Sequence, residues 1–196
     1  MRAHSTSQKF FYSTWRTHFN HQANGNFPSH VNQSGTIERK DFDLAIERIC
    51  RMRGFNPGDP KHQQTQDILI NVWDGLRARA DSNKDGQVSH EEWCMMWDEY
   101  ARNSGPALEW QQRYMNFMFD LEDTSGDGCI DEEEFTTVCS SYGVSPAECS
   151  EAFNRFSQNK TVIVDRAKFA ELWKQYFASE DPNAPGNFIF GKVTFE

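Results

Sequence analysis

Apolar side chains recur every three or four residues along most of the chain, which is the spacing of one buried helix face. Asp59 and Pro60 mark one helix start, because an N-cap aspartate and a proline at the first helical position both suit that end. Residues 145–148 form a capping box with a proline at its first helical position, and Gly54 suits a helix end. The predicted faces are Phe11, Trp15 and Phe19; Phe42, Ile46 and Ile49; Ile68, Leu69, Val72, Trp73 and Leu76; Trp93, Met96, Trp97 and Tyr100; Trp110, Tyr114, Phe117, Met118 and Leu121; Phe135, Val138, Cys139 and Tyr142; Ala152, Phe153 and Phe156; and Phe169, Leu172, Trp173 and Tyr176.

Short loops rich in Asp, Asn and Gly separate these helices, so a helix–loop–helix unit recurs along the chain. The aromatic residue that follows each loop is Phe42, Trp93, Phe135 or Phe169. We therefore predict an all-α protein of four helix–loop–helix units, arranged in two pairs and packed into one compact body. The stretch 102–106 is the best hinge, which places the first pair in residues 1–102 and the second in 103–196.

The charge of the chain narrows the classes of partner. The formal net charge is −9, which argues against nucleic acid or an anionic membrane surface. No apolar run approaches a membrane span, and the segment 1–10 has no hydrophobic signal core. The 5 cysteines form no CxxC pair and indicate reduced thiols. We expect a cytoplasmic protein without a transmembrane segment, and a monomer.

Residues 81–92, DSNKDGQVSHEE, satisfy the calcium-loop pattern D-x-[DN]-x-[DN]-G-x5-E in full. Calcium takes about six to eight oxygen ligands, and such a loop supplies them from positions 1, 3, 5, 7, 9 and 12. Gly86 at position 6 permits the sharp turn, and Val88 at position 8 should pair with the neighbouring loop. The expected ligands are Asp81, Asn83, Asp85, the backbone carbonyl of Gln87, Ser89 through water, and bidentate Glu92.

Residues 123–134, DTSGDGCIDEEE, repeat the pattern with one departure, since a serine replaces Asp or Asn at position 3. A serine still offers an oxygen. The acid at position 9 adds a fourth carboxylate, so we expect tighter calcium binding here or competition from Mg²⁺. The expected ligands are Asp123, Ser125, Asp127, the backbone carbonyl of Cys129, Asp131 and Glu134.

Residues 157–168, SQNKTVIVDRAK, form the fourth loop in this register. Position 1 is Ser157, position 12 is Lys168, and Asp165 is the one acid, so we expect no calcium binding. Val164 at position 8 should still pair with Ile130.

Residues 30–41, HVNQSGTIERKD, form the first loop, because Phe42 follows Asp41 as the other aromatic residues follow their loops. Histidine, asparagine and serine occupy positions 1, 3 and 5, where calcium favours carboxylates. The ten residues 20–29, NHQANGNFPS, look like an insertion that displaces the ligands at the start of the loop. We predict weak or no calcium binding in this interrupted loop (residues 20–41) and a structural pairing of Ile37 with Val88.

These motifs resemble the calexcitin and sarcoplasmic calcium-binding protein group of four-EF-hand proteins, over nearly the whole chain. The resemblance to calexcitin is carried by DFDLAIERIC, WDGLR, KDGQVSHEEW, YMNFMFDLEDTSGD, SSYG and PGNFIFGK. It implies a mainly helical protein of two EF-hand pairs that binds calcium in only some hands. Calexcitins are neuronal calcium-signalling proteins linked to potassium-channel and calcium-release control, so an ion channel or other signalling target is implied. The first loop departs from the group, where acidic ligands are usual.

Two weaker signals have simpler interpretations. Residues 186–192 spell GxxxxGK, the start of a phosphate-binding loop, but Val193 stands where Ser or Thr should hold magnesium. A C-terminal tail that packs on the body is the simpler interpretation. His18, His21 and His30 lack the spacing of a zinc site and are expected at the surface.

Three functions remain open. In a calcium-signalling protein, Glu92 and Glu134 would draw their exit helices toward the ion and alter the exposed apolar surface. In a calcium buffer that change would be small, and a chain with 6 Met and many aromatics favours a filled core. A GTP-binding protein would use residues 186–192, but no catalytic base or nucleophile can be assigned. We favour calcium signalling and expect no enzyme.

Overall fold

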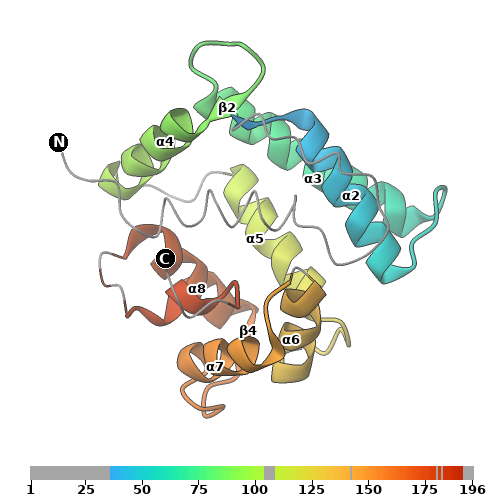
Figure 1. The fold of residues 1–196 in the computed structure, drawn as a ribbon, viewed down its shortest axis with the longest axis vertical. Coiled ribbons are helices and arrows are strands. Elements are labelled where there is room, and N and C mark those ends of the chain that lie inside the picture. Colours follow the sequence, from blue (N-terminus) through green and yellow to red (C-terminus); the bar gives the residue numbers. More distant parts are fainter. Residues whose placement is uncertain (1–35, 104–108, 142, 180, 182, 192–196) are drawn as a thin grey trace. The chain divides into compact units, whose positions relative to one another are not determined.

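The computed structural model describes residues 36–103, 109–141, 143–179, 181 and 183–191, which form helices joined by short loops and two small antiparallel sheets (Figure 1). The predicted helix–loop–helix architecture is confirmed. The chain separates into two units, and the change falls inside helix α5 (Glu109–Glu122), between Tyr114 and Met115. The predicted boundary between residues 102 and 103 stays a prediction.

The unit that ends at Tyr114 contains two helix–loop–helix elements. Its strands pair antiparallel, with Ile37 opposite Val88 as predicted. Gly54 ends the first helix at a φ of 68° and donates its N–H to the Arg51 carbonyl, also as predicted. The elements are β1 (Thr36–Ile37), α2 (Arg39–Arg53), α3 (Pro60–Ala80), β2 (Val88–Ser89), α4 (His90–Asn103) and the first part of α5.

Aromatic side chains fill the interior of this unit. The rings of Phe42 on α2 and Trp73 on α3 lie 5.3 Å apart, and those of Trp97 on α4 and Trp110 on α5 lie 6.1 Å apart. Gly75 on α3 allows α5 to approach, because a Cβ atom built there would lie 2.5 Å from the Trp110 Cβ. The predicted face residues whose side chains the structure describes in this unit are all buried except Ile68, which is half-buried.

The unit that begins at Met115 repeats this plan. Its strands pair with Ile130 opposite Val164, as predicted. Ser145 caps a helix by accepting the Glu148 N–H at 3.3 Å, which confirms the predicted helix start. The elements are the rest of α5, β3 (Cys129–Ile130), α6 (Glu132–Ser141), α7 (Pro146–Phe156), β4 (Val164–Asp165), α8 (Arg166–Ala178) and the 3-10 helix η1 (Pro185–Phe188).

The C-terminal segment packs onto this second unit. Phe188, Ile189 and Phe190 are buried, and the Phe190 ring lies 4.9 Å from that of Tyr176 on α8. Gly186 sits inside η1 rather than between a strand and a helix, so the GxxxxGK stretch lacks the setting of a phosphate loop up to residue 191. The packing interpretation is confirmed for these residues, and Lys192 lies outside the described part.

Several predictions fall outside the described residues. They concern the helix face at residues 11–19, the insertion at 20–29 and the histidines at 18, 21 and 30. Within the ranges given above, none of the helices combines the length and apolar character that crossing a bilayer requires.

Candidate functional site

The loop between α3 and α4 is held by hydrogen bonds from its own backbone to its acidic and amide side chains. Asp81 accepts the N–H groups of Asp85 at 3.2 Å and Gly86 at 3.0 Å. Asp85 in turn accepts the Gln87 N–H at 2.9 Å, and the Asn83 side-chain oxygen accepts the Asp85 N–H at 2.9 Å. Gly86 has a φ of 84°, the left-handed conformation predicted for position 6. These hydrogen bonds tie the side chains at positions 1, 3 and 5 to the backbone N–H groups of positions 5, 6 and 7.

Glu92 at position 12 joins the two ends of this loop. One carboxylate oxygen accepts the N–H and hydroxyl of Ser82, at 3.0 and 2.9 Å. The other accepts the N–H and hydroxyl of Ser89, at 3.0 and 2.8 Å. Burial by itself raises the pKa of Glu92, but the hydrogen bonds from Ser89 and Ser82 outweigh it and lower the pKa to about 2. The carboxylate is therefore ionised, and it lies where the loop closes on itself.

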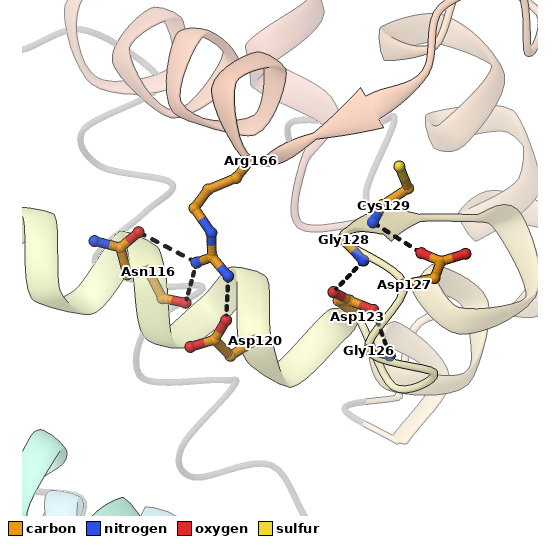
Figure 2. Close-up of polar contacts among 8 residues, drawn as sticks. All are labelled: Asn116, Asp120, Asp123, Gly126, Asp127, Gly128, Cys129 and Arg166. Atoms are coloured by element: carbon orange, nitrogen blue, oxygen red, sulfur yellow. Dashed lines mark hydrogen bonds and ion pairs between the residues drawn. The ribbon is translucent and has the colours of Figure 1, made fainter.

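The loop between α5 and α6 has the same construction (Figure 2). Asp123 accepts the N–H groups of Gly126 at 2.7 Å and Gly128 at 3.0 Å. Asp127 accepts the Cys129 N–H at 2.9 Å. Gly128 has a φ of 88°, matching Gly86 in the other loop.

Glu134 closes this second loop as Glu92 closes the first. One of its oxygens accepts the Ser125 N–H at 2.8 Å and the Thr124 hydroxyl at 3.1 Å, and the other accepts the Asp131 N–H at 3.1 Å. Burial raises the pKa of Glu134, whereas hydrogen bonds from Ser125, Asp131 and Thr124 lower it, and the net direction is downward.

Two site residues have no place in the sequence pattern, which treats position 2 as variable. Ser82 and Thr124 both occupy that position, and each donates its hydroxyl to the position-12 carboxylate. The sequence does contain a hint of this role, because both intact loops carry a hydroxyl residue at position 2, whereas the fourth loop carries Gln158 at that position.

Each of these two loops suits a hard cation. Oxygen donors occupy the expected ligand positions of both loops, and they include three carboxylates in 81–92 and four in 123–134. Among the described residues, no three His, Cys, Asp or Glu side chains already stand as a metal cluster. Oxygens of both loops accept N–H hydrogen bonds, so a bound cation would replace some of these contacts.

The fourth loop has a different backbone. Gln158, Asn159 and Lys160 have φ values of 53°, 55° and 65°, which non-glycine residues adopt rarely. Ser157 is fully buried and its carbonyl accepts the Val162 N–H at 3.0 Å. The predicted β-pairing of this loop is confirmed, and its lack of a calcium ion stays a prediction.

The first loop is described from Thr36 onward. Asp41 at position 12 is only 3% exposed and accepts the Glu38 N–H at 2.8 Å, so it caps α2. The pairing of Ile37 is confirmed, and weak or absent calcium binding stays a prediction.

Comparison with known proteins connects these loops to a family. The EF hand family profile matches residues 78–96. Sarcoplasmic calcium-binding proteins I, III and IV of Branchiostoma lanceolatum are 30% identical over 164 residues, which cover 82% of this chain and 88% of theirs. Calexcitin-1 of Caenorhabditis elegans is 31% identical over 168 residues, covering 84% of this chain and 80% of its own. A solved sarcoplasmic calcium-binding protein from amphioxus superposes with a TM-score of 0.74 at 27% identity, covering 96% of this chain and 98% of that one.

Proposed function

The chain belongs to the group of EF-hand proteins that includes sarcoplasmic calcium-binding proteins and calexcitin, and we propose that it binds one calcium ion in loop 81–92 and one in loop 123–134. Calcium supplies a positive charge that needs about six to eight oxygens around it. Magnesium is expected to compete at 123–134, where the fourth carboxylate lies. The proposed ligands are Asp81, Asn83, Asp85, the Gln87 carbonyl, Ser89 through water and Glu92, and Asp123, Ser125, Asp127, the Cys129 carbonyl, Asp131 and Glu134.

The position-12 carboxylate carries this proposal. In each loop its two oxygens face opposite ends of the loop, one toward positions 2 and 3 and the other toward position 9. A cation between those ends meets both oxygens of Glu92 or Glu134, which is the bidentate contact that calcium takes in an EF-hand.

Calorimetric titration of the full chain with calcium tests the assignment. We expect two tightly bound ions, and one fewer in each of Glu92→Gln and Glu134→Gln. The matched controls are Glu91→Gln and Glu133→Gln, which remove the same charge from exposed neighbours on the same helices. Unchanged stoichiometry in the first two variants would contradict the ligand set.

We propose further that calcium binding is a signal, because calexcitin-1 is among the relatives. Calcium-responsive EF-hand pairs open and expose an apolar groove to a target. An ion channel or another signalling protein is the proposed kind of target. A cytoplasmic monomer is the form we propose for the chain, in keeping with relatives that are named sarcoplasmic.

Calcium buffering is the second candidate, and one observation favours it. Glu92 and Glu134 already hold their exit helices α4 and α6 against the start of each loop, so less movement is left for calcium to cause. Buffer EF-hands open very little on binding. A hydrophobic dye added during the titration separates the two functions. Dye binding that rises with calcium supports signalling, and no rise supports buffering.

A further inference from the structure

The fourth hand contacts loop 123–134 and the helix that leads into it, although we assign the fourth hand no ion. Arg166, at position 10 of the fourth loop, reaches α5 just before that loop begins (Figure 2). Its guanidinium donates to Asp120 at 2.5 Å, and to the side-chain oxygen and the backbone carbonyl of Asn116 at 3.2 and 3.4 Å. It also lies 4.3 Å above the Phe119 ring. Asp120 precedes the first ligand, Asp123, by one helical turn, so Arg166 fixes the helix that delivers that ligand.

Lys160 makes the second contact, at the other end of loop 123–134. Its ammonium pairs with Glu132, which also accepts the hydroxyl of Ser150 on α7. Glu132 lies between the ligands Asp131 and Glu134. Lys160 is presented from the left-handed stretch of the fourth loop, with a φ of 65° and its N–H donated to the Ser157 hydroxyl at 3.0 Å. The unusual backbone of the fourth loop therefore places a cation against the exit end of the third.

The β-bridge connects the two contacts. Cys129 pairs with Asp165 and Ile130 with Val164, so the middle of loop 123–134 is attached to the strand that runs directly into Arg166. The helix that leads into the loop, the middle of the loop and its end are thus each held by a residue of the fourth hand.

We propose that Arg166 and Lys160 are positioning residues that hold loop 123–134 in its calcium-binding shape before the ion arrives. The degenerate fourth hand then sets the affinity of the third site by limiting how far its ligands relax when the ion leaves. The inference rests on the proposed calcium site in that loop.

Charge repulsion alone predicts the opposite change in calcium affinity when Arg166 or Lys160 is removed. The direction of the measured change in affinity therefore tests the proposal. Arg166 and Lys160 are positive charges close to a cation site, so removing either should strengthen calcium binding through weaker repulsion. A positioning role means that removal weakens binding, because the ligands must then be ordered at the moment of binding.

The experiment measures the third site by itself, in full-length protein carrying Glu92→Gln. Arg166→Gln, Lys160→Gln and the charge-keeping Arg166→Lys are added singly, and Lys174→Gln is the control for loss of an exposed positive charge on α8. Calorimetry gives the calcium dissociation constant, and stopped-flow mixing with a fluorescent chelator gives the dissociation rate. Thermal unfolding without calcium shows whether each variant is folded.

We expect Arg166→Gln and Lys160→Gln each to weaken binding by about two- to fivefold, the size of one exposed charge contact, through faster dissociation. Arg166→Lys should lie between Arg166→Gln and the parent, because an ammonium cannot reproduce the guanidinium fork. Lys174→Gln should bind no more weakly than the parent. In a Glu134→Gln background, Arg166→Gln should leave the second site unchanged.

Unchanged or tighter binding in Arg166→Gln and Lys160→Gln overturns the inference and leaves the proposed function standing. Equal weakening of the site at 81–92 also overturns it, since the effect would then be general. If the Glu92→Gln protein binds no calcium, the site at 123–134 is itself refuted, and the inference falls with it.

Discussion

Replacing Glu92 by Gln removes one negative charge from loop 81–92 and keeps the size and shape of the side chain. Four contacts at 3.0 Å or less hold the carboxylate, two from Ser82 and two from Ser89. A glutamine can place its oxygen toward Ser82, but its NH₂ group then faces the Ser89 N–H. One backbone donor loses its acceptor in the metal-free protein, and the bidentate contact to calcium is lost as well.

The two losses have separate magnitudes. An unsatisfied donor at a part-buried site costs about 1 kcal/mol, which lowers the melting temperature of a chain this long by about 2–4 °C. An ion present at about 100 times its dissociation constant stabilises the folded state by about 2.7 kcal/mol. The variant should therefore lose a further ~5–11 °C of the stabilisation that calcium gives the parent.

Thermal unfolding with calcium and with a chelator separates the two effects. The control is Glu91→Gln, because Glu91 is exposed on the same first turn of α4 and carries the same charge. We expect calcium to raise the melting temperature of the control by nearly as much as it raises that of the parent. If calcium raises the melting temperature of Glu92→Gln as much as that of the parent, the ligand assignment is refuted. If the calcium-dependent rise is reduced equally in both variants, only the overall charge matters.

Three further predictions concern Glu92, Asp41 and Gly75. The pKa of Glu92 is lowered from 4.5 to about 2, so its ionised form stabilises the fold above pH 4.5. As the pH falls from 4.5 to about 2, the metal-free parent should lose up to about 3 kcal/mol of unfolding free energy. Denaturant titrations at matched pH should show a smaller loss for Glu92→Gln. Asp41→Asn should lower the melting temperature by weakening the cap of α2 and leave the calcium stoichiometry unchanged; a lost ion would show that the first loop binds. Gly75→Ala should destabilise the fold, because the added methyl group would lie 2.5 Å from the Trp110 Cβ. Overpacking costs about 1–3 kcal/mol, which exceeds the gain in helix propensity of about 1 kcal/mol. A higher melting temperature in this variant would contradict the contact.

Local spacing predicts much of this architecture. The register of the loops follows from the aromatic residue after position 12 and, in three of the four, from a glycine at position 6. It predicts Ile37 opposite Val88 and Ile130 opposite Val164, as the structure has them. The calcium ligands follow from the same register and stay proposals.

Contacts between distant segments could not be read from the sequence. Arg166 meets Asp120 across 46 residues, and an exposed arginine near a helix start has many alternative partners. The role of Gly75 depends on which helix lies against it, and that requires the packing of α3 on α5. The hydroxyl of Ser82 lies outside the calcium-loop pattern because position 2 is no metal ligand, although it donates to Glu92, which is an expected one.

The described parts of the hands share one set of contacts, all made by the residues of the chain itself. Each has a β-bridge at position 8, followed by a cap on the exit helix that joins positions 9 and 12. In three hands the side chain at position 9 caps the exit helix by accepting the N–H of position 12; the pairs are Ser89 and Glu92, Asp131 and Glu134, and Asp165 and Lys168. In the first hand the direction is reversed, because the Asp41 side chain at position 12 accepts the N–H of position 9. The first half of the loop can therefore lose its carboxylates without undoing the bridge or the exit helix. The fourth hand, which we propose binds no ion, keeps both its β-bridge to the third hand and the cap on its exit helix.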